Sequence, residues 1–249
     1  MKKKIIGIKL GSATLVEAGI IQEKFIKSVC AQIAKLIQNG YGVFIVTSGA
    51  VASDSREGRS KNLRSAVGQP RIMQAYSKYL GQLGLDSAQM LLTDEQLIDV
   101  KSAKTKLTKR IMQEALVFGV VPIINANDVI DSEEVEALRY CADNDKLFKL
   151  MCKLIDAKIA IIGFDQTGFM DAKKNVLHKL KISELDSVLK FVKGGSKLGH
   201  GQNGMRTKIL SLAELAKAGM QVHLAPAKEK NFILRSVAGE ENFGTKFLV

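Results

Sequence analysis

Residues 5–12 constrain the fold more strongly than any other part of the chain. They read Ile-Ile-Gly-Ile-Lys-Leu-Gly-Ser, a short and almost continuously apolar run that ends in small residues. Such a run is typical of a β-strand buried on both faces, and strands of that kind lie in the middle of parallel sheets. Gly11 ends the run, and a glycine lets backbone amides come close to a ligand. We therefore expect a central parallel strand that leads into a ligand-binding turn.

Lys9 is the single charged residue in this run. A lysine buried in a strand needs a charged partner or an anionic ligand, because an isolated buried charge is costly. Lys9 also lies near the carboxyl end of the predicted strand, where open α/β sheets bind their ligands. The stretch by itself leaves two interpretations open: Lys9 binds a phosphate, or it is a solvated lysine before a loop.

Downstream, apolar strands alternate with segments of helical spacing. The strand signals fall at residues 43–46, 89–92, 120–124, 158–162 and 222–224, and the helical patterns at residues 25–37, 143–155 and 205–216. Strands that alternate with helices predict an α/β fold. We expect a three-layer sandwich with a mostly parallel central sheet and helices on both faces. A chain of 249 residues can form it as a single domain, residues 1–249.

Composition narrows the range of partners. The net charge is +12 and the pI is near 9.5, which suits a phosphate-rich partner such as a nucleotide or a nucleic acid. The densest basic cluster, residues 101–110, contains no aromatic residue and no nucleic-acid motif, so it indicates a solvated helix face or loop.

No apolar run is long enough to span a membrane. The three cysteines lack Cys-x-x-Cys spacing, which fits a reducing compartment better than a disulfide framework or a zinc site. We expect a cytoplasmic protein without a nucleic-acid or membrane partner.

Small, polar or acidic residues follow the predicted strands. Because the carboxyl ends of parallel strands lie along one edge of a sheet, these residues can converge on one crevice. Ser48 and Gly49 can bind a substrate carboxylate or form only a tight turn, and Asn127 and Asp128 can likewise be ligands or turn residues. The residues concerned are Gly11, Ser48, Gly49, Ala50, Thr93, Asn127, Asp128 and Asp165.

Two predicted helix starts add further candidates. Residues 201–208 read Gly-Gln-Asn-Gly-Met-Arg-Thr-Lys, and glycines before a helix favour an anion at its positive end. Lys208 can then reach a phosphoryl group, unless the segment is a plain connection with a solvated lysine. Residues 143–145 read Asp-Asn-Asp, and acids suit any helix start. In the functional interpretation, Asp145 holds two lysines and Asn144 donates to a carboxylate substrate.

No Ser-His-Asp or Cys-His arrangement is recognisable in the sequence, and this bears on the reaction. A kinase that acts on a hydroxyl usually needs a base, whereas a carboxylic acid with a pKa of about 4.3 is already ionised at neutral pH. An enzyme that phosphorylates a carboxylate has mainly to bring two anions together and neutralise the developing charge. Two lysines, amide-lined turns and a divalent metal are sufficient for that.

Seven short motifs occur in order along the chain, at residues 9–12, 46–50, 66–69, 89–93, 121–128, 143–145 and 204–208. Together they resemble the amino acid kinase family over nearly the whole chain. The resemblance implies an ATP-dependent phosphotransferase with a carboxyl acceptor that uses Mg²⁺ and converts L-glutamate to γ-glutamyl phosphate, the first step of proline biosynthesis. It also implies a homo-oligomer, inhibition by proline and a functional link to γ-glutamyl phosphate reductase.

The same resemblance assigns a role to each candidate residue. Lys9 and Lys208 would flank the transferred phosphoryl group, and Asp145 would orient them. Glutamate would be bound by Ser48, Gly49, Ala50, Asp128 and Asn144. The nucleotide would be bound by Lys9, Gly11, Asp165, Gly201, Gly204, Met205, Thr207 and Lys208. The resemblance assigns no residue to the metal.

Several positions depart from the family pattern. Phe164 stands where the family has threonine, and Gln202 and Asn203 interrupt a glycine-rich stretch, so these changes bear on nucleotide contacts. Ala126 and Ala142 replace an acidic residue and a glycine, and these changes bear on glutamate affinity or feedback control.

Three other functions stay open at this point. The first is a relative that acts on another acid or on a nucleoside monophosphate, and the second is a non-catalytic nucleotide or amino-acid sensor on the same scaffold. The third is RNA binding through the basic surface, which would weaken steeply with salt. Many family members add a C-terminal PUA domain. We expect none here, because the family pattern ends shortly before Val249.

Overall fold

The structure is a computed structural model and describes residues 3–93, 96–130, 144–171, 173–191 and 202–249. Its strands are β1 (Ile5–Leu10), β2 (Val16–Glu17), β3 (Ile20–Ile21), β4 (Gly42–Val46), β5 (Ser87–Leu92), β6 (Val121–Ala126), β7 (Ile159–Phe164), β8 (Lys179–Lys181), β9 (Gln221–Pro226) and β10 (Thr245–Leu248). Its α-helices are α1 (Ser12–Leu15), α2 (Glu23–Gln38), α3 (Lys61–Gly81), α4 (Ala103–Phe118), α5 (Asn144–Leu154), α6 (Leu185–Phe191), α7 (Gln202–Lys217) and α8 (Phe232–Ala238). Short 3₁₀ helices are η1 (Val51–Ser53) and η4 (Ile182–Glu184).

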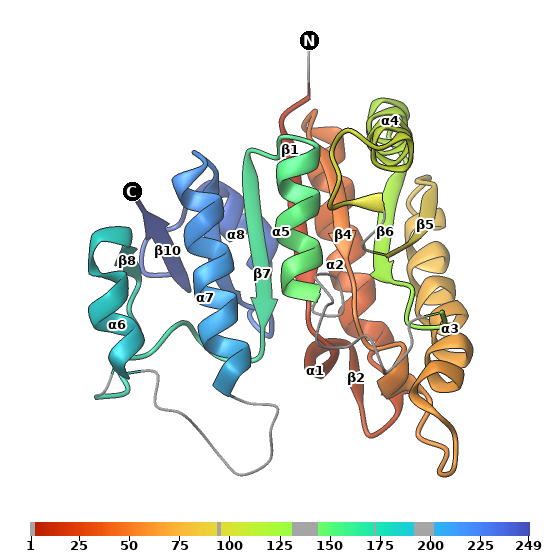
Figure 1. The fold of residues 1–249 in the computed structure, drawn as a ribbon, viewed down its shortest axis with the longest axis horizontal. Helices are drawn as coiled ribbons and strands as arrows, with labels where there is room; N and C mark the ends of the chain where they lie inside the picture. The colour runs from red at the N-terminus through yellow and green to blue at the C-terminus, as the bar shows by residue number, and fades with distance from the viewer. Residues whose placement is uncertain (1–2, 94–95, 131–143, 172, 192–201) are drawn as a thin grey trace.

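One large sheet organises the molecule. Within the described residues, eight strands form it in the order β5-β6-β4-β1-β7-β9-β10-β8 (Figure 1). All neighbours from β5 to β9 run parallel, and β10 runs antiparallel to β9. β1 lies between β4 and β7, and all six of its residues are buried. The expected α/β sandwich, the mostly parallel sheet and the central place of the first strand are therefore confirmed.

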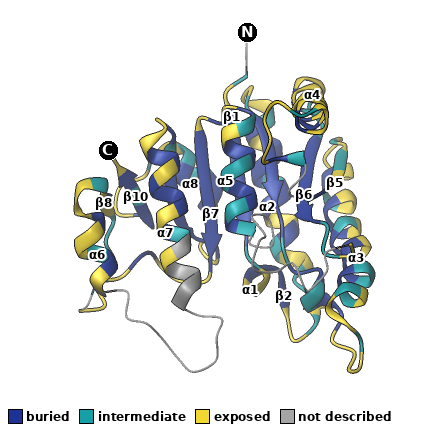
Figure 2. Cartoon of the chain, in the orientation of Figure 1, coloured by how far each residue is buried: buried dark blue, intermediate teal, exposed yellow. Residues whose placement is uncertain are grey.

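Helices cover both faces of this sheet. The apolar side chains of α2, α3 and α8 join one hydrophobic core, and those of α4, α5 and α7 join a second core on the opposite face. Figure 2 shows buried strands between helices whose outer surfaces are exposed. Among the described helices, none combines the length and the apolar character needed to cross a bilayer.

The alternation of side chains along β1 decides where Lys9 points. Ile6, Ile8 and Leu10 enter the core under α2, α3 and α8, and Ile5 enters the core on the other face. Since successive strand residues point to opposite faces, Lys9 shares the side of Ile5 and lies under α5 and α7. The strand thus supplies hydrophobic burial with one set of residues and a charged group with the other.

Gly7 allows α5 to lie close to β1. A Cβ atom at this position would come within 2.6 Å of the Phe44 ring and 2.9 Å of the Cys152 sulfur. Burial raises the pKa of the Cys152 thiol, so this side chain packs as a neutral group. Cys152 and Asp145 are seven residues apart on α5 and so share one helix face. The contact at Gly7 therefore helps to fix the height of Asp145 above the sheet.

Element boundaries differ from the sequence-based ones where strand pairing continues. Asn125 and Ala126 belong to β6, and Gly163 and Phe164 belong to β7, because each pairs with a neighbouring strand. Helix α3 was not predicted. Residues 101–110, expected as a helix face or a loop, lead into and form the first half of α4.

The contact between α3 and the turn after β4 should be highly sensitive to size. A Cβ atom at Gly68 would lie 1.8 Å from the carbonyl oxygen of Ala50, and backbone on both sides leaves little room to relax. We expect Gly68→Ala to lower the free energy of unfolding by about 3 kcal/mol, measured by chemical denaturation. Gly81→Ala is the matched control on the same helix, because a Cβ atom there would meet nothing within 4 Å. Equal stability of the two variants would contradict this account of the contact.

Candidate active site

Two lysines from distant parts of the chain contact one carboxylate. Nζ of Lys9, on β1, lies 2.7 Å from Oδ1 of Asp145, and Nζ of Lys208, on α7, lies 3.6 Å from Oδ2. The side chains of Lys9, Asp145 and Lys208 are only 8%, 7% and 17% exposed. The interpretation of Lys9 as a solvated lysine is therefore wrong, and Lys208 is not a free surface lysine either.

Local structure explains the positions of Asp145 and Lys208 in this cluster. Asp145 lies in the first turn of α5, where the helix dipole favours a negative charge, so its structural and functional interpretations are compatible. Helix α7 packs along α5, and the two are joined by ion pairs from Lys149 and Lys153 to Glu214, at 3.0 and 3.1 Å. These contacts hold α7 in the register that brings Lys208 to Asp145.

The cluster concentrates positive charge. The ammonium groups of Lys9 and Lys208 lie beside one carboxylate. In a buried setting, charge interactions are stronger than in water. The two ammonium groups would attract an anion that binds beside them. The cluster is therefore suited to a ligand with a phosphoryl group or a carboxylate.

A second group of candidates lies at the turn after β4. Nδ2 of Asn144 donates to Oγ of Ser48 at 2.7 Å, so the residue next to Asp145 is tied to this turn. The Oδ1 atom of Asn144 is buried and has no hydrogen-bond partner in the described part of the chain. Gly49 has φ +93°, a backbone conformation that side chains disfavour. The turn thus presents a hydroxyl, backbone amides and an unused amide oxygen near the lysine cluster.

Asp54 anchors the far end of this turn. Its side chain is 1% exposed, and Arg59 donates to its carboxylate at 2.8 Å. This hydrogen bond holds the pKa of Asp54 below its usual value. Arg71, from α3, donates to the carbonyl oxygen of Ser53 at 2.7 Å. The segment behind Ser48 is therefore fixed by charged hydrogen bonds that sequence patterns did not reveal.

Asp128 lies in the turn after β6 and is held by α3. Oγ of Ser65 donates to Oδ2 of Asp128 at 3.3 Å, and Nδ2 of Asn62 donates to the Asp128 carbonyl oxygen at 2.8 Å. Asp128 and the neighbouring Asn127 are half-buried. Neither Asn62 nor Ser65 was a candidate from the sequence, because a polar residue on a helix gives no signal of its own.

The nucleotide candidates are placed less completely. Gly11 precedes α1, and a Cβ atom there would lie 4.0 Å from Nζ of Lys9, so Gly11 borders the lysine cluster. Asp165 follows β7 and is exposed. Gly201 lies outside the described residues, as do Ala142 and Asp143.

Helix α7 starts earlier than the sequence predicted. It begins at Gln202, so Gly204, Met205 and Thr207 lie in its first two turns and not in a loop before it. Glutamine and asparagine have a higher helix propensity than the glycines they replace in the family pattern, which favours the longer helix.

The departures at Phe164 and Ala126 lie in packed positions. Phe164 is 6% exposed and belongs to the hydrophobic core on the α5 and α7 side of the sheet. Ala126 is 4% exposed and belongs to the same core. Both residues therefore contribute to packing in the described structure.

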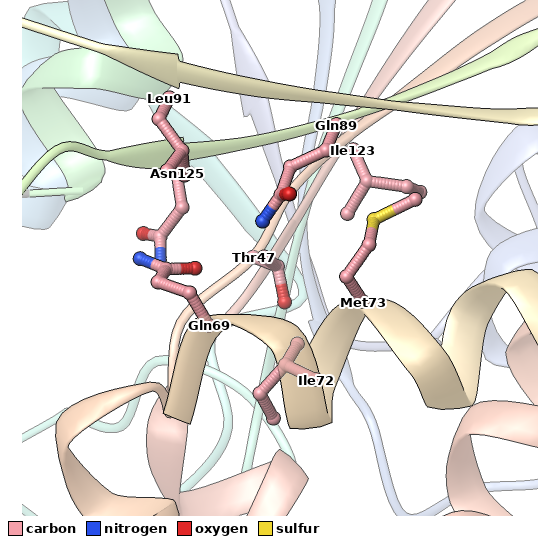
Figure 3. Close-up of a pocket in the computed structure, with 8 residues that line it drawn as sticks. All are labelled: Thr47, Gln69, Ile72, Met73, Gln89, Leu91, Ile123 and Asn125. Carbon is pink, nitrogen blue, oxygen red and sulfur yellow. The ribbon is translucent and has the colours of Figure 1, made fainter. Parts of the chain in front are cut away.

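A small cavity lies behind the Ser48 turn, among β4, β5, β6 and α3. Figure 3 shows Thr47, Gln69, Gln89 and Asn125 among the residues that line it. Its volume of about 10 Å³ accommodates about one water molecule, which is too small for a metabolite. Thr47, which lines the cavity, also has its Oγ1 3.3 Å from the Tyr76 hydroxyl, and this contact links the end of β4 to α3.

Comparisons with known proteins agree on the family. The model described as the amino acid kinase family matches residues 4–226. Glutamate 5-kinase from Haemophilus influenzae (strain PittEE) is 30% identical over 100% of this chain and 69% of its own length. Glutamate 5-kinase from Pelobacter propionicus is 34% identical over 99% of this chain and 68% of its own length. The structure of Giardia carbamate kinase has a TM-score of 0.70 at 16% identity and covers 99% of both chains, which shows the shared fold.

Removing the shared carboxylate should destabilise the protein. In Asp145→Asn, the ammonium groups of Lys9 and Lys208 lose the carboxylate that they share, and we expect the free energy of unfolding to fall by about 3 kcal/mol. Chemical denaturation at low ionic strength measures this. Asp156→Asn is the control, because Asp156 pairs with Lys158 at 2.7 Å but is 61% exposed, and its stability should not change. If both variants unfold like the unmodified protein, the buried cluster does not depend on this carboxylate.

Proposed function

The chain belongs to the amino acid kinase family, and from this we propose that it transfers the γ-phosphoryl group of ATP to the γ-carboxylate of L-glutamate. The products would be γ-glutamyl phosphate and ADP. Two curated glutamate 5-kinases support the proposal, at 30% and 34% identity over nearly all of this chain. The observation that carries it is the contact of Lys9 and Lys208 with one buried carboxylate.

In the proposed reaction, the lysines act on charge. A γ-carboxylate oxygen attacks the γ-phosphorus, and the bond from phosphorus to the β,γ-bridging oxygen breaks, so that ADP leaves with the electron pair. Lys9 and Lys208 stabilise the charge that moves across the phosphoryl group, and Asp145 keeps both ammonium groups in place. The carboxylate acceptor is already ionised, so the step requires no base.

For glutamate binding, the proposal uses the two turns that flank the cluster. The Ser48 hydroxyl and the amides of Gly49 and Ala50 would bind a substrate carboxylate. Asp128 would bind the ammonium group, since it is the acidic side chain at the second turn. Asn144 links this site to Asp145, because its amide contacts Ser48 and it is the preceding residue in the chain.

The nucleotide would bind on the other side of the lysine cluster. The two lysines fit its phosphates because they place two ammonium groups side by side at one carboxylate. Among the described residues, no group of three or more His, Cys, Asp and Glu side chains is arranged to hold a metal. Mg²⁺ would arrive with ATP, since Mg²⁺ often keeps several waters and binds mainly to substrate phosphates. When bound, Mg²⁺ would neutralise phosphate charge. The other residues proposed for the nucleotide are Gly11, Asp165, Gly201, Gly204, Met205 and Thr207.

The proposal extends to the cellular setting. Residues 1–249 would act as one kinase domain in the cytoplasm, and the free, buried thiols of Cys30 and Cys152 are compatible with a reducing compartment. A homo-oligomer is proposed by analogy with the family. A functional link to γ-glutamyl phosphate reductase is proposed because an acyl phosphate is readily hydrolysed and has to be consumed soon after it forms.

Acceptor-dependent release of ADP tests the proposed activity. Purified protein with Mg-ATP should release ADP with L-glutamate, and not with carbamate, a nucleoside monophosphate or N-acetylglutamate. Turnover with one of these other acceptors would indicate that the protein has the activity of a different member of the family. Nucleotide or glutamate binding without turnover would indicate a sensor.

Lys208→Ala should abolish most of this turnover. The variant removes one of two positive charges at the transferred group, and we expect kcat to fall by at least about 100-fold. Lys217→Ala is the matched control, because Lys217 is an exposed lysine in the last turn of the same helix. A Lys208→Ala enzyme with kcat close to that of the control would refute the assigned role.

A further inference from the structure

One face of α3 contacts the end of β6 and the turn after it, at three successive helix turns. Asn62, Ser65 and Gln69 are spaced i, i+3 and i+7, and so lie on the same side of the helix. Asn62 donates to the carbonyl oxygens of Asp128 and Val129, at 2.8 and 3.3 Å. Nε2 of Gln69 donates to the Ala126 carbonyl oxygen at 3.3 Å. Figure 3 shows Gln69 extending from α3 toward Asn125 on β6.

Ser65 is the member of this set that contacts a charged group. Its side chain is fully buried, and its Oγ donates to Oδ2 of Asp128 at 3.3 Å. A buried hydroxyl seldom stays without a partner, and a hydrogen bond to a carboxylate is stronger than one between neutral groups. The bond therefore restricts the orientation of the Asp128 side chain.

The same helix also contacts the turn that carries Ser48. Gly68 lies against the carbonyl oxygen of Ala50, since a Cβ atom there would approach it to 1.8 Å. Ser53, which follows in η1, donates from its Oγ to the same oxygen at 2.8 Å. Helix α3 thus touches both turns proposed to bind glutamate, and it sets the spacing between them.

We propose that Ser65 is a positioning residue for glutamate binding. Its hydroxyl holds the Asp128 carboxylate in the orientation that receives the substrate ammonium group, while the backbone contacts of Asn62 and Gln69 fix the turn itself. The inference rests on the proposed function, in which Asp128 binds glutamate. It assigns to Ser65 an effect on substrate affinity that a merely well-packed small residue would not have.

Ser65→Ala tests the proposal through a split between kinetic constants. Loss of one hydrogen bond to a carboxylate should raise the KM for glutamate about tenfold, and kcat and the KM for ATP should stay within about twofold. Ser77→Ala is the matched control on α3, because Ser77 is exposed and its hydroxyl contacts only Ser87 in the described structure, at 2.9 Å. Its KM for glutamate should equal that of the unmodified enzyme.

A double-mutant cycle separates positioning from general loss of structure. If Ser65 acts through Asp128, then adding Ser65→Ala to Asp128→Asn should raise the KM for glutamate by less than about twofold. A full tenfold effect in that background would overturn the proposal. So would a Ser65→Ala enzyme that loses affinity for glutamate and ATP alike together with a lower melting temperature, because that pattern indicates a structural role alone.

The unmodified enzyme distinguishes failure of this inference from failure of the proposed function. If it shows no glutamate-dependent release of ADP and no binding of glutamate by calorimetry, the proposed function fails and the role of Ser65 fails with it. If it turns over glutamate and Ser65→Ala has the same KM as Ser77→Ala, the inference alone is wrong.

Discussion

The carboxylate of Asp145 is the point at which three distant segments of the chain meet. It pairs with Lys9 from the central strand and with Lys208 from α7, and it lies in the first turn of the helix between them. Because a buried charge needs a counter-charge, the packing of α5 and α7 on the sheet also brings the charged groups of the site together. Gly7 contributes by admitting the side of α5 that carries Asp145. The same packing that forms the hydrophobic core therefore also positions the charged residues of the site.

The sheet could be read from the sequence because its strands are short apolar runs separated by helical spacing. Helix α3 could not, since Gly68, Gln69 and Pro70 interrupt its pattern with a glycine, a buried polar residue and a proline within the helix. Two of these residues are explained by tertiary contacts: Gly68 admits the carbonyl of Ala50, and Gln69 donates to that of Ala126. A local pattern does not contain that information.

The site was predictable to the extent that its residues follow strand ends or helix starts. Lys9, Ser48, Asp128 and Asp145 stand at such positions, but only their combination with the family motifs favoured ligand binding over turns and helix caps. The meeting of Lys9 with Lys208 depends on the register of α7 on α5, which ion pairs to Glu214 support. Residues that position a binding residue, such as Ser65, belong to no motif that the sequence reveals. Their contacts are visible only in the structure.

Because Lys9 and Lys208 share one carboxylate, the effect of a substitution at one of these positions depends on the residue at the other. Replacing either Lys9 or Lys208 with a neutral residue leaves the other lysine paired with Asp145 and removes a repulsion between the two cations. Replacing both leaves the buried carboxylate without either ammonium group, so the costs of the two changes to folding are more than additive. As related sequences diverge, the residue present at one of these two positions therefore affects which substitutions are tolerated at the other. This is epistasis, and it arises because both lysines contact the same carboxylate.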